Sequence, residues 1–371
     1  VERTTINASI SRVVSAKTEW QSVLDCAANP DIQIIISNTT EVGLTLVPTD
    51  AASLYPESFP GKLLHFLIER YRVFNGSLES GLVIIPTELI SDNGIKLKEI
   101  VIELAKLKGL DEAFINWVNT ANDFCSSLVD CIVPGKLPAS EQAQFEQKVG
   151  YQDSLAIMSE PYRLWAIETA NQKTAAILSF AAADARVILA PSINKYKEIK
   201  LRLLNATHSL CCGVAILSEF LTVRDALNDK TFKDFLSSML LDEIVPLVAE
   251  GDITMEEARS FALQVIDRFS NQSIEHLWVN IAVQYTAKMH MRVVPLVDKY
   301  VKQHGNAPVL ISFGFAAYLL FMKSKNDPGA IDALVSKTTM VASEVFDKQV
   351  FDCIDKMETS SIKNVLVSLL N

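Results

Sequence analysis

Short apolar runs alternate with amphipathic stretches in the first part of the chain. The runs are continuous, as in strands buried on both faces, whereas the stretches repeat apolar residues every three or four positions, as in helices that pack on one side. This alternation predicts a parallel sheet with helices on its faces. The predicted strands are 32–37 and 81–86, and the predicted helices are 18–28, 61–74 and 97–107.

The pattern becomes helical after about residue 150 and stays so. Each long segment there shows the three-to-four period, and Thr254 with Glu257 gives one of them a capping-box sequence. Short spacers between the segments favour antiparallel neighbours. We therefore expect an α/β domain over 1–150 and a mostly α-helical domain over 151–371. The predicted helices are 200–221, 231–248, 254–269, 274–301 and 307–322.

Each predicted strand ends in a polar stretch. Asn38-Thr39-Thr40-Glu41 follows the first strand, and Thr87-Glu88 follows the second. Because sites in parallel sheets lie beyond the carboxyl ends of the strands, these residues are candidates for a binding site. Ordinary polar turn residues would give the same pattern.

A lysine, a carboxamide and an imidazole lie within nine residues in the stretch from Lys200 to His208. At about 100° per residue on an α-helix, Asn205 lies about 140° and His208 about 80° from Lys200, so all three can project from one broad side. A lysine partly removed from water has a lowered pKa and can take a proton from a hydroxyl, while the other two side chains hydrogen-bond the reacting oxygen. Three solvated polar residues on an amphipathic helix are the alternative interpretation.

The composition excludes several classes of function. The 371 residues carry a net charge of −10 without a basic stripe, so we expect no nucleic-acid partner. The six cysteines form no CxxC and no zinc-type spacing, which favours free thiols over a metal site or a disulfide framework. The longest apolar run, 307–322, is short for a membrane span. A soluble cytoplasmic enzyme fits these features, with no metal and no membrane partner.

Residues 196–209 resemble the catalytic helix of the mannitol dehydrogenase family, the polyol-specific long-chain dehydrogenases. The pattern of that family is Lys, four residues, Asn, two residues, His, which matches Lys200, Asn205 and His208. Further segments resemble the family in the same order, so the resemblance covers roughly residues 5 to 322. These segments are 37–41, 85–94, 124–134 and 268–271.

The resemblance implies a Rossmann-like α/β domain, with a parallel sheet that lacks its first part, followed by a mostly α-helical catalytic domain. It implies NAD as the cofactor and a small sugar acid as the substrate. The implied site residues are Lys200, Asn205 and His208 as catalytic groups, Glu88, Asp130 and Arg268 as substrate-binding groups, and Asn38, Thr39, Thr40 and Glu41 as cofactor-binding groups. Arg268 is predicted near a helix end. Its charge could therefore interact favourably with the helix dipole there, instead of binding a substrate carboxylate.

Within the family, 37–41 and 86–90 resemble the tagaturonate reductase branch. The mannitol and fructuronate branches carry Ser-Cys-Asp-Asn where this chain has Pro86-Thr-Glu-Leu89. We therefore predict reversible hydride transfer between NAD(H) and a keto-hexuronate, tagaturonate to altronate, with Lys200 exchanging the proton. Two alternatives stay open. The first is a mannitol or fructuronate dehydrogenase, which Leu89 disfavours because those branches carry Asn at this position. The second is a non-catalytic helical interaction protein.

The sequence departs from the family pattern at two places. It contains no G-x-G-x-x-G, the turn that holds a cofactor pyrophosphate, so we expect the first part of the cofactor domain either to be absent from the chain or not to be ordered. The Val-Asp-Arg of the family becomes Val129-Asp130-Cys131, which removes an arginine that could pair with a carboxylate. Elsewhere, His276 follows Glu275, but neighbouring helix residues diverge, so we predict no pair there.

Overall fold

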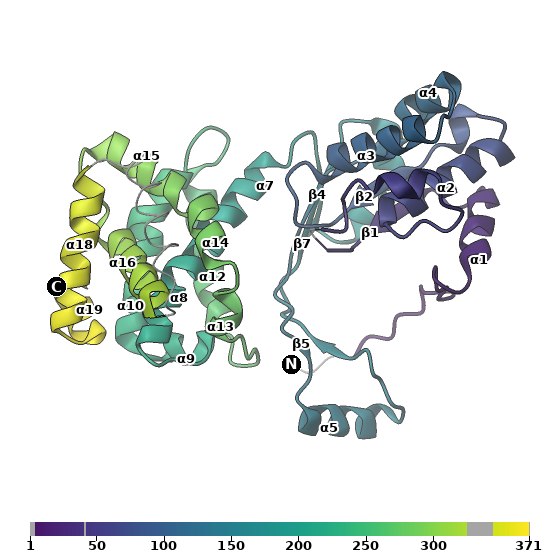
Figure 1. Cartoon of the computed structure of the whole chain (residues 1–371). Helices are drawn as coiled ribbons and strands as arrows, with labels where there is room; N and C mark the ends of the chain where they lie inside the picture. The colour runs from purple at the N-terminus through teal and green to yellow at the C-terminus, as the bar shows by residue number, and fades with distance from the viewer. Residues whose placement is uncertain (1–3, 41, 325–343, 371) are drawn as a thin grey trace. The chain divides into compact units, whose positions relative to one another are not determined.

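The computed structural model describes residues 4–40, 42–324 and 344–370, and the chain divides into two compact units (Figure 1). Unit 1 comprises residues 1–129 and 163–193, and unit 2 comprises residues 130–162 and 194–371. The expected single boundary near residue 150 stays a prediction. The contacts within the chain group 130–162 with the helical unit and 163–193 with the sheet unit.

Parallel strands form the centre of unit 1. Strands β1 (Ile34–Ser37), β2 (Val83–Pro86) and β3 (Asp123–Phe124) pair in parallel in the order β1-β2-β3. A second group follows the order β4-β7-β8, with β4 at Ser127–Asp130, β7 at Leu164–Glu168 and β8 at Val187–Ala190, and β7 and β8 are parallel. The predicted parallel sheet is confirmed.

Alternate residues of β2 enter two different cores, which explains why its sequence is apolar without interruption. Ile84 belongs to the cluster formed with α2 (Phe59–Val73), α3 (Asn93–Leu107) and α4 (Glu112–Ala121). Val83 and Ile85 point into a smaller cluster with Ile167 of β7. All four residues of β2 are buried, as expected for a strand covered on both faces.

The remaining elements of unit 1 are short. Helix α1 and a 3₁₀ turn precede β1, two further 3₁₀ turns flank α2, and α6 with another 3₁₀ turn leads to β8. Their bounds are α1 Trp20–Asp25, η1 Cys26–Ala28, η2 Pro48–Ala51, η3 Leu78–Ser80, α6 Gln172–Ile177 and η4 Ser179–Ala183. Among the described residues β1 pairs with β2 alone, and Ile36 on β1 is half exposed.

A buried arginine ties α2 to the chain segments around the sheet. Arg70 is 2% exposed, and its guanidinium donates hydrogen bonds to the backbone oxygens of Ala27, Asn29, Ile32 and Ser80 at 2.6–3.1 Å. Burial lowers the pKa of Arg70. Because all four acceptors are neutral carbonyls, the planar fork of the side chain, and not an ion pair, holds these segments together.

Unit 2 is mostly α-helical, and the expectation of a helical second domain is confirmed. It also contains an arm in which β5 (Gly135–Lys136) and β6 (Ile157–Met158) pair antiparallel on either side of α5 (Ala139–Val149). The other helices are α7 Asn194–Ile199, α8 Thr207–Leu217, α9 Val223–Asn228, α10 Lys230–Ser238, α11 Val245–Val248, α12 Met255–Phe269, α13 Trp278–Ile281, α14 Tyr285–Arg292, α15 Val294–His304, α16 Val309–Ser324, α18 Glu344–Thr359 and α19 Ile362–Leu370. Two π-helical turns, η5 (Lys200–Ala206) and η6 (Met239–Ile244), interrupt this set.

The apolar segment 307–322 forms the buried centre of unit 2 as helix α16, which packs against α8 and α18. The capping box is also present, because the Thr254 side chain accepts from the Glu257 backbone and the Glu257 carboxylate accepts from the Thr254 backbone. No helix in the described ranges has both the length and the apolar character that crossing a bilayer requires.

The single helix expected over 274–301 is wrong, because three helices occupy this range. Gln284 adopts a left-handed backbone conformation, with φ of 56°, and separates α13 from α14. Val293 then separates α14 from α15, which carries Pro295 in its first turn. Proline lacks the N–H that a continuous helix would need at this point, so a new helix begins there.

Candidate functional site

The predicted catalytic residues begin in a π-helix and not in an α-helix. Residues Lys200–Ala206 form η5, which continues directly into α8. Because the hydrogen bonds of a π-helix join residues five positions apart, Lys200 and Asn205 lie close to the same side of the helix. The separation of about 140° expected from α-helical geometry is therefore wrong, and the actual backbone aligns these two residues better.

Lys200 is largely removed from water. Its side chain is 13% exposed, and its Nζ lies 3.5 Å from Oδ1 of Asp130. Burial lowers the pKa of Lys200, and the charges of Arg268 and Arg292 lower it further, while Asp130 opposes the shift. The direction is the one expected of a lysine that exchanges protons near neutral pH.

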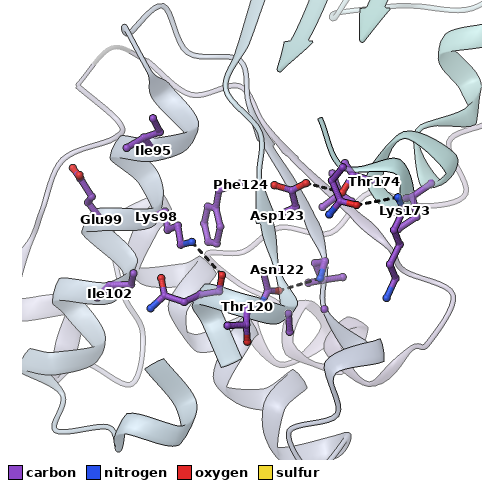
Figure 2. Close-up of a pocket in the computed structure, with 17 residues that line it drawn as sticks. Ile95, Lys98, Glu99, Ile102, Thr120, Asn122, Asp123, Phe124, Lys173 and Thr174 are labelled. Carbon is purple, nitrogen blue, oxygen red and sulfur yellow. Dashed lines mark hydrogen bonds between the residues drawn. The ribbon is translucent and has the colours of Figure 1, made fainter. Parts of the chain in front are cut away.

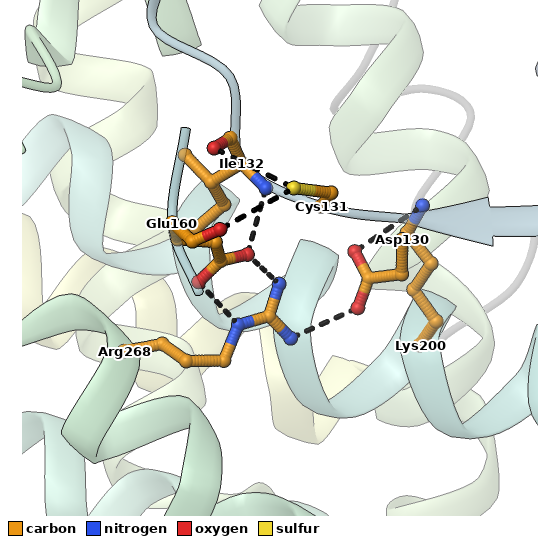
Figure 3. Close-up of polar contacts among 6 residues, drawn as sticks. All are labelled: Asp130, Cys131, Ile132, Glu160, Lys200 and Arg268. Carbon is orange, nitrogen blue, oxygen red and sulfur yellow. Dashed lines mark hydrogen bonds and ion pairs between the residues drawn. The ribbon is translucent and has the colours of Figure 1, made fainter. Parts of the chain in front are cut away.

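Asp130 belongs to a buried chain of ion pairs (Figure 3). Its Oδ2 accepts a hydrogen bond from Nη1 of Arg268 at 2.9 Å, on the side away from Lys200. The Nε and Nη2 of Arg268 donate to the two carboxylate oxygens of Glu160 at 3.0 and 2.7 Å. These hydrogen bonds raise the pKa of Arg268, although burial acts in the opposite direction.

Arg268 thus has two carboxylates of the protein as partners, and its guanidinium also lies 4.0 Å from the ring centre of Tyr162. Three of its five N–H groups are engaged by Asp130 and Glu160. Its expected position at a helix end is confirmed, since α12 ends at Phe269. Its expected role toward a substrate carboxylate stays a prediction.

His208 lies inside the helical unit and not at its surface. Its ring stacks on Phe269, with centroids 3.9 Å apart, and meets the rings of His276 and Trp278 edge to face. Its Nε2 is buried and has no hydrogen-bond partner among the described residues. Burial lowers the pKa of His208 well below its ordinary value, with smaller contributions from His276 and Arg292, so the ring is neutral at physiological pH.

Asn205 is held through its backbone. Its carbonyl accepts hydrogen bonds from the Ser209 hydroxyl at 3.0 Å and from Nη1 of Arg292 at 3.4 Å. Arg292 also lowers the pKa of both Lys200 and His208, so the charge of one arginine acts on two of the predicted catalytic residues while its side chain contacts the third.

The second group of predicted residues lies in unit 1, at the carboxyl ends of β1 and β2. Glu88 is buried, and its carboxylate accepts from the Ser37 hydroxyl and from both the backbone N–H and the hydroxyl of Thr39 at 2.7–3.0 Å. Asn38 accepts a weaker hydrogen bond from the Thr87 hydroxyl. Glu88 thus fixes the loop that follows β1, and its direct contact with substrate stays a prediction.

The loop after β1 suits part of a nicotinamide cofactor. Asn38, Thr39 and Thr40 are exposed polar residues at the carboxyl end of a parallel strand, where such ligands bind. Glu41 lies outside the described residues. Carboxamide and hydroxyl groups of this kind can hydrogen-bond polar parts of a nicotinamide cofactor, whereas the sequence contains no glycine-rich turn for its pyrophosphate. The expected convergence of this loop with Lys200 stays a prediction.

A separate hollow of about 610 Å³ lies in unit 1 (Figure 2), at the end of β2 and β3 where these strands begin. Several of its polar groups are engaged by neighbours. Lys98 donates to the Asn119 carbonyl at 3.3 Å, and the Thr174 hydroxyl donates to Asp123 at 2.6 Å. The hollow therefore lies at the opposite end of the strands from Asn38 and does not belong to the candidate site.

Three residues near the predicted site were not expected from the sequence. Glu160 contacts Arg268, Arg292 contacts Asn205, and the ring of His276 lies 5.3 Å from that of His208. No local spacing in the sequence links Glu160 to Arg268, which lies 108 positions away.

Two models of one family match the chain. The mannitol dehydrogenase Rossmann domain matches residues 2–178, and the mannitol dehydrogenase C-terminal domain matches residues 192–358.

Curated relatives include several altronate oxidoreductases. That of Halalkalibacterium halodurans is 37% identical over 322 residues, which are 86% of this chain and 62% of that protein. That of Bacillus subtilis is 37% identical over 314 residues, 84% and 64% of the two chains, and that of Escherichia coli is 35% identical over 320 residues, 86% and 65%. This chain therefore spans a little less than two thirds of the length of these relatives.

Solved structures with a similar fold include two sugar-alcohol dehydrogenases. Substrate-free D-sorbitol dehydrogenase gives a TM-score of 0.76 at 19% identity, over 94% of this chain and 77% of that one. Mannitol 2-dehydrogenase of Pseudomonas fluorescens, in a ternary complex with NAD and D-mannitol, gives a TM-score of 0.69 at 19% identity. The match covers 98% of this chain and 79% of that one. At this identity the likeness concerns the fold alone, a Rossmann-like unit and a helical unit. The two family models, which together match most of the residues, establish that the chain belongs to the mannitol dehydrogenase family.

Proposed function

We propose that this protein acts as an NAD-dependent dehydrogenase that interconverts a keto-hexuronate and the corresponding hexonate, tagaturonate and altronate. The observation that carries the proposal is a buried lysine with a lowered pKa, Lys200, held 3.5 Å from the carboxylate of Asp130. The names of the relatives at 35–37% identity support the choice of substrate.

Lys200 is the group that exchanges a proton with the reacting oxygen. In the oxidation of altronate, the neutral amine takes the hydroxyl proton, and in the reduction of tagaturonate, the ammonium returns it to the oxygen. Asp130 lies close enough to hold the ammonium form after the proton arrives. Burial lowers the pKa of Lys200, which makes the neutral amine available at a lower pH than in a lysine exposed to water.

Asn205 and His208 are the residues that hold the reacting oxygen and the neighbouring hydroxyl. Asn205 lies on the Lys200 side of η5, because the two are five positions apart in a π-helix. The buried Nε2 of His208 has no partner among the described residues, so a substrate hydroxyl would satisfy it. Groups already fixed in place stabilise developing charge without a cost of reorganisation.

A nicotinamide cofactor supplies the hydride acceptor or donor when it is bound. On this chain, Asn38, Thr39 and Thr40 would hold part of it, with Glu88 keeping their loop in place through Thr39. Glu88, Asp130 and Arg268 remain the proposed substrate-binding groups.

An assay with the intact protein tests the proposal. NADH is supplied with a panel of keto-hexuronates and ketohexoses, and the loss of NADH absorbance is followed. We expect tagaturonate to be reduced with a kcat/KM at least tenfold above that of any neutral ketohexose. A preference for fructose, or no turnover of any member of the panel, would contradict the proposal.

A further inference from the structure

Glu160 lies at the base of the β5–α5–β6 arm, where it closes the arm on itself. Its backbone N–H donates to the Ile132 carbonyl at 3.0 Å, and its Oε1 accepts from the Ile132 backbone N–H at 2.7 Å. The Glu160 side chain is only 1% exposed. Pro161 follows it and restricts its backbone to an extended conformation, so the carboxylate has little freedom to leave this position.

The carboxylate of Glu160 determines where the guanidinium of Arg268 can lie. It binds two N–H groups of Arg268 side by side, which is the geometry that fixes the plane of a guanidinium most firmly. Tyr162 covers one face of the same group at 4.0 Å. With Nε and Nη2 held by Glu160, the Nη1 of Arg268 is directed at Asp130.

Arg268 in turn orients the carboxylate of Asp130. A carboxylate can rotate about its bond to the side chain, so the hydrogen bond from Arg268 to Oδ2 decides where Oδ1 lies. In the structure Oδ1 is the atom that lies 3.5 Å from Nζ of Lys200. The contacts thus form one line of alternating charge: Glu160, Arg268, Asp130 and Lys200 (Figure 3).

We propose that Glu160 is a positioning residue for the proton-transfer lysine: it holds Arg268, and through Arg268 it aims the Asp130 carboxylate at Lys200. Glu160 does not touch the reacting atoms in this scheme. The inference rests on the proposed role of Lys200, and it adds a residue from the base of the arm to the catalytic arrangement.

Because these four charged groups lie in one line, a change at Glu160 should alter the pKa of Lys200 at the other end. The charged groups that act on Lys200 are Asp130 from β4, Arg268 from α12 and Arg292 from α14. Glu160 neutralises Arg268, so its loss leaves an uncompensated cation beside Asp130 and weakens the attraction between Asp130 and the ammonium of Lys200. The pKa of Lys200 should therefore fall when Glu160 loses its charge.

The experiment compares Glu160→Gln with the parent in the intact protein. The titration of Lys200 is measured without reference to activity, from the rate of its acetylation by acetic anhydride at a series of pH values and mass spectrometry of the labelled peptide. We expect the midpoint to move down by roughly half to one pH unit. The rise of kcat with pH in altronate oxidation should move by the same amount, and kcat at its plateau should fall about tenfold.

Two further variants separate positioning from stability. Glu256→Gln removes an exposed carboxylate from the same helix as Arg268 and should change neither titration nor kcat. Glu160→Asp keeps the charge but shortens the side chain, so the midpoint should stay within about 0.3 unit of the parent while kcat falls several-fold. If Glu160→Gln does not fold, as judged by circular dichroism, Glu160→Asp decides the matter, and an unchanged kcat overturns the proposal.

The outcomes also distinguish this inference from the proposed function. A lower melting temperature in Glu160→Gln, with the titration of Lys200 and the pH profile unchanged, would mean that Glu160 is structural only and would overturn the inference. If Glu160→Gln shifts the acetylation midpoint as expected but the parent turns over no substrate of the panel, the positioning of Lys200 stands and the proposed function fails.

Discussion

Replacing Asp130 by Asn removes the negative charge that lies 3.5 Å from the amine of Lys200. Asparagine keeps the shape of the side chain and can still accept a hydrogen bond from Arg268, so the change is mainly one of charge. Without the carboxylate, the ammonium form of Lys200 loses its stabilising partner, and the pKa of Lys200 falls below its already lowered value.

The size of the effect follows from the distance. Two unit charges 3.5 Å apart interact by about 4.7 kcal/mol at an effective dielectric constant of about 20, which corresponds to about 3.5 pKa units. The lysine side chain keeps 13% of its exposure, so water and local relaxation reduce the interaction. We therefore expect the pKa of Lys200 to fall by about 1–2 units, which is more than Glu160→Gln should cause.

The sign of the shift decides how activity changes with pH. Oxidation needs the neutral amine, so the rise of kcat with pH should move to lower pH by about 1–2 units. Reduction needs the ammonium, so its rate at neutral pH should fall in the same variant. Asp130 is also a proposed substrate-binding residue, so KM is expected to rise. The test is therefore the pH at which kcat of oxidation rises, and not the absolute rate.

The assay measures kcat against pH in both directions, together with the acetylation midpoint of Lys200. Breaking a buried ion pair costs about 3–5 kcal/mol of the free energy of unfolding, so circular dichroism must first show that the variant is folded at the assay temperature. Asp234→Asn, which removes a half-exposed carboxylate paired with the exposed Lys230, is the control and should shift neither curve. If the rise of kcat with pH in oxidation stays at the same pH, or moves to higher pH, the reasoning is refuted.

Three other outcomes are expected. Lys200→Ala should lower turnover by about 100- to 10,000-fold and abolish the pH limb while leaving NADH binding, followed by fluorescence, close to that of the parent; near-parent activity with an unchanged pH profile would show that another group moves the proton. His208 is buried and neutral, with a folded-state pKa well below that of the unfolded chain, so the unfolded state binds the extra proton and stability is lost as pH falls below about 6.5. Urea unfolding should show this loss with a slope of up to about 1.4 kcal/mol per pH unit, and His208→Gln, which cannot titrate, should have a shallower slope; an equal slope would contradict the assignment. Arg70→Met leaves four backbone carbonyls without their donor and should lower the free energy of unfolding by about 3–5 kcal/mol, whereas Arg72→Met, on the exposed side of the same helix, should cost less than about 1 kcal/mol; similar costs would argue against the clamp.

The sequence was sufficient for the sheet and for most helices because burial leaves a local pattern. The uninterrupted apolar run that became β2 follows from two cores that share one strand, and the run 307–322 follows from a helix surrounded by others. The break at Gln284 left no such pattern. Apolar residues continue at helical spacing through it, and a left-handed conformation at a single glutamine depends on the packing around it.

The candidate site was predicted only as far as neighbouring residues could reveal it. Lys200, Asn205 and His208 lie within nine positions, so their grouping is visible in the sequence, whereas Glu160 lies 108 positions from Arg268, and no local spacing links the two. Glu88 could be placed at a strand end, but the hydrogen bonds that commit it to Thr39 require the fold. Ion pairs between residues far apart in the sequence depend on how helices and strands pack against one another. Hydrophobic periodicity does not encode that packing.

The π-helix at Lys200–Ala206 gives the family motif a physical meaning beyond its list of residue types. One hydrogen bond of a π-helix spans five positions, so the interval between Lys200 and Asn205 equals the span of one such bond in the backbone that carries them. A relative with one residue fewer between the lysine and the asparagine would match an ordinary α-helical step instead, and the alignment of the two side chains would then depend on a different backbone.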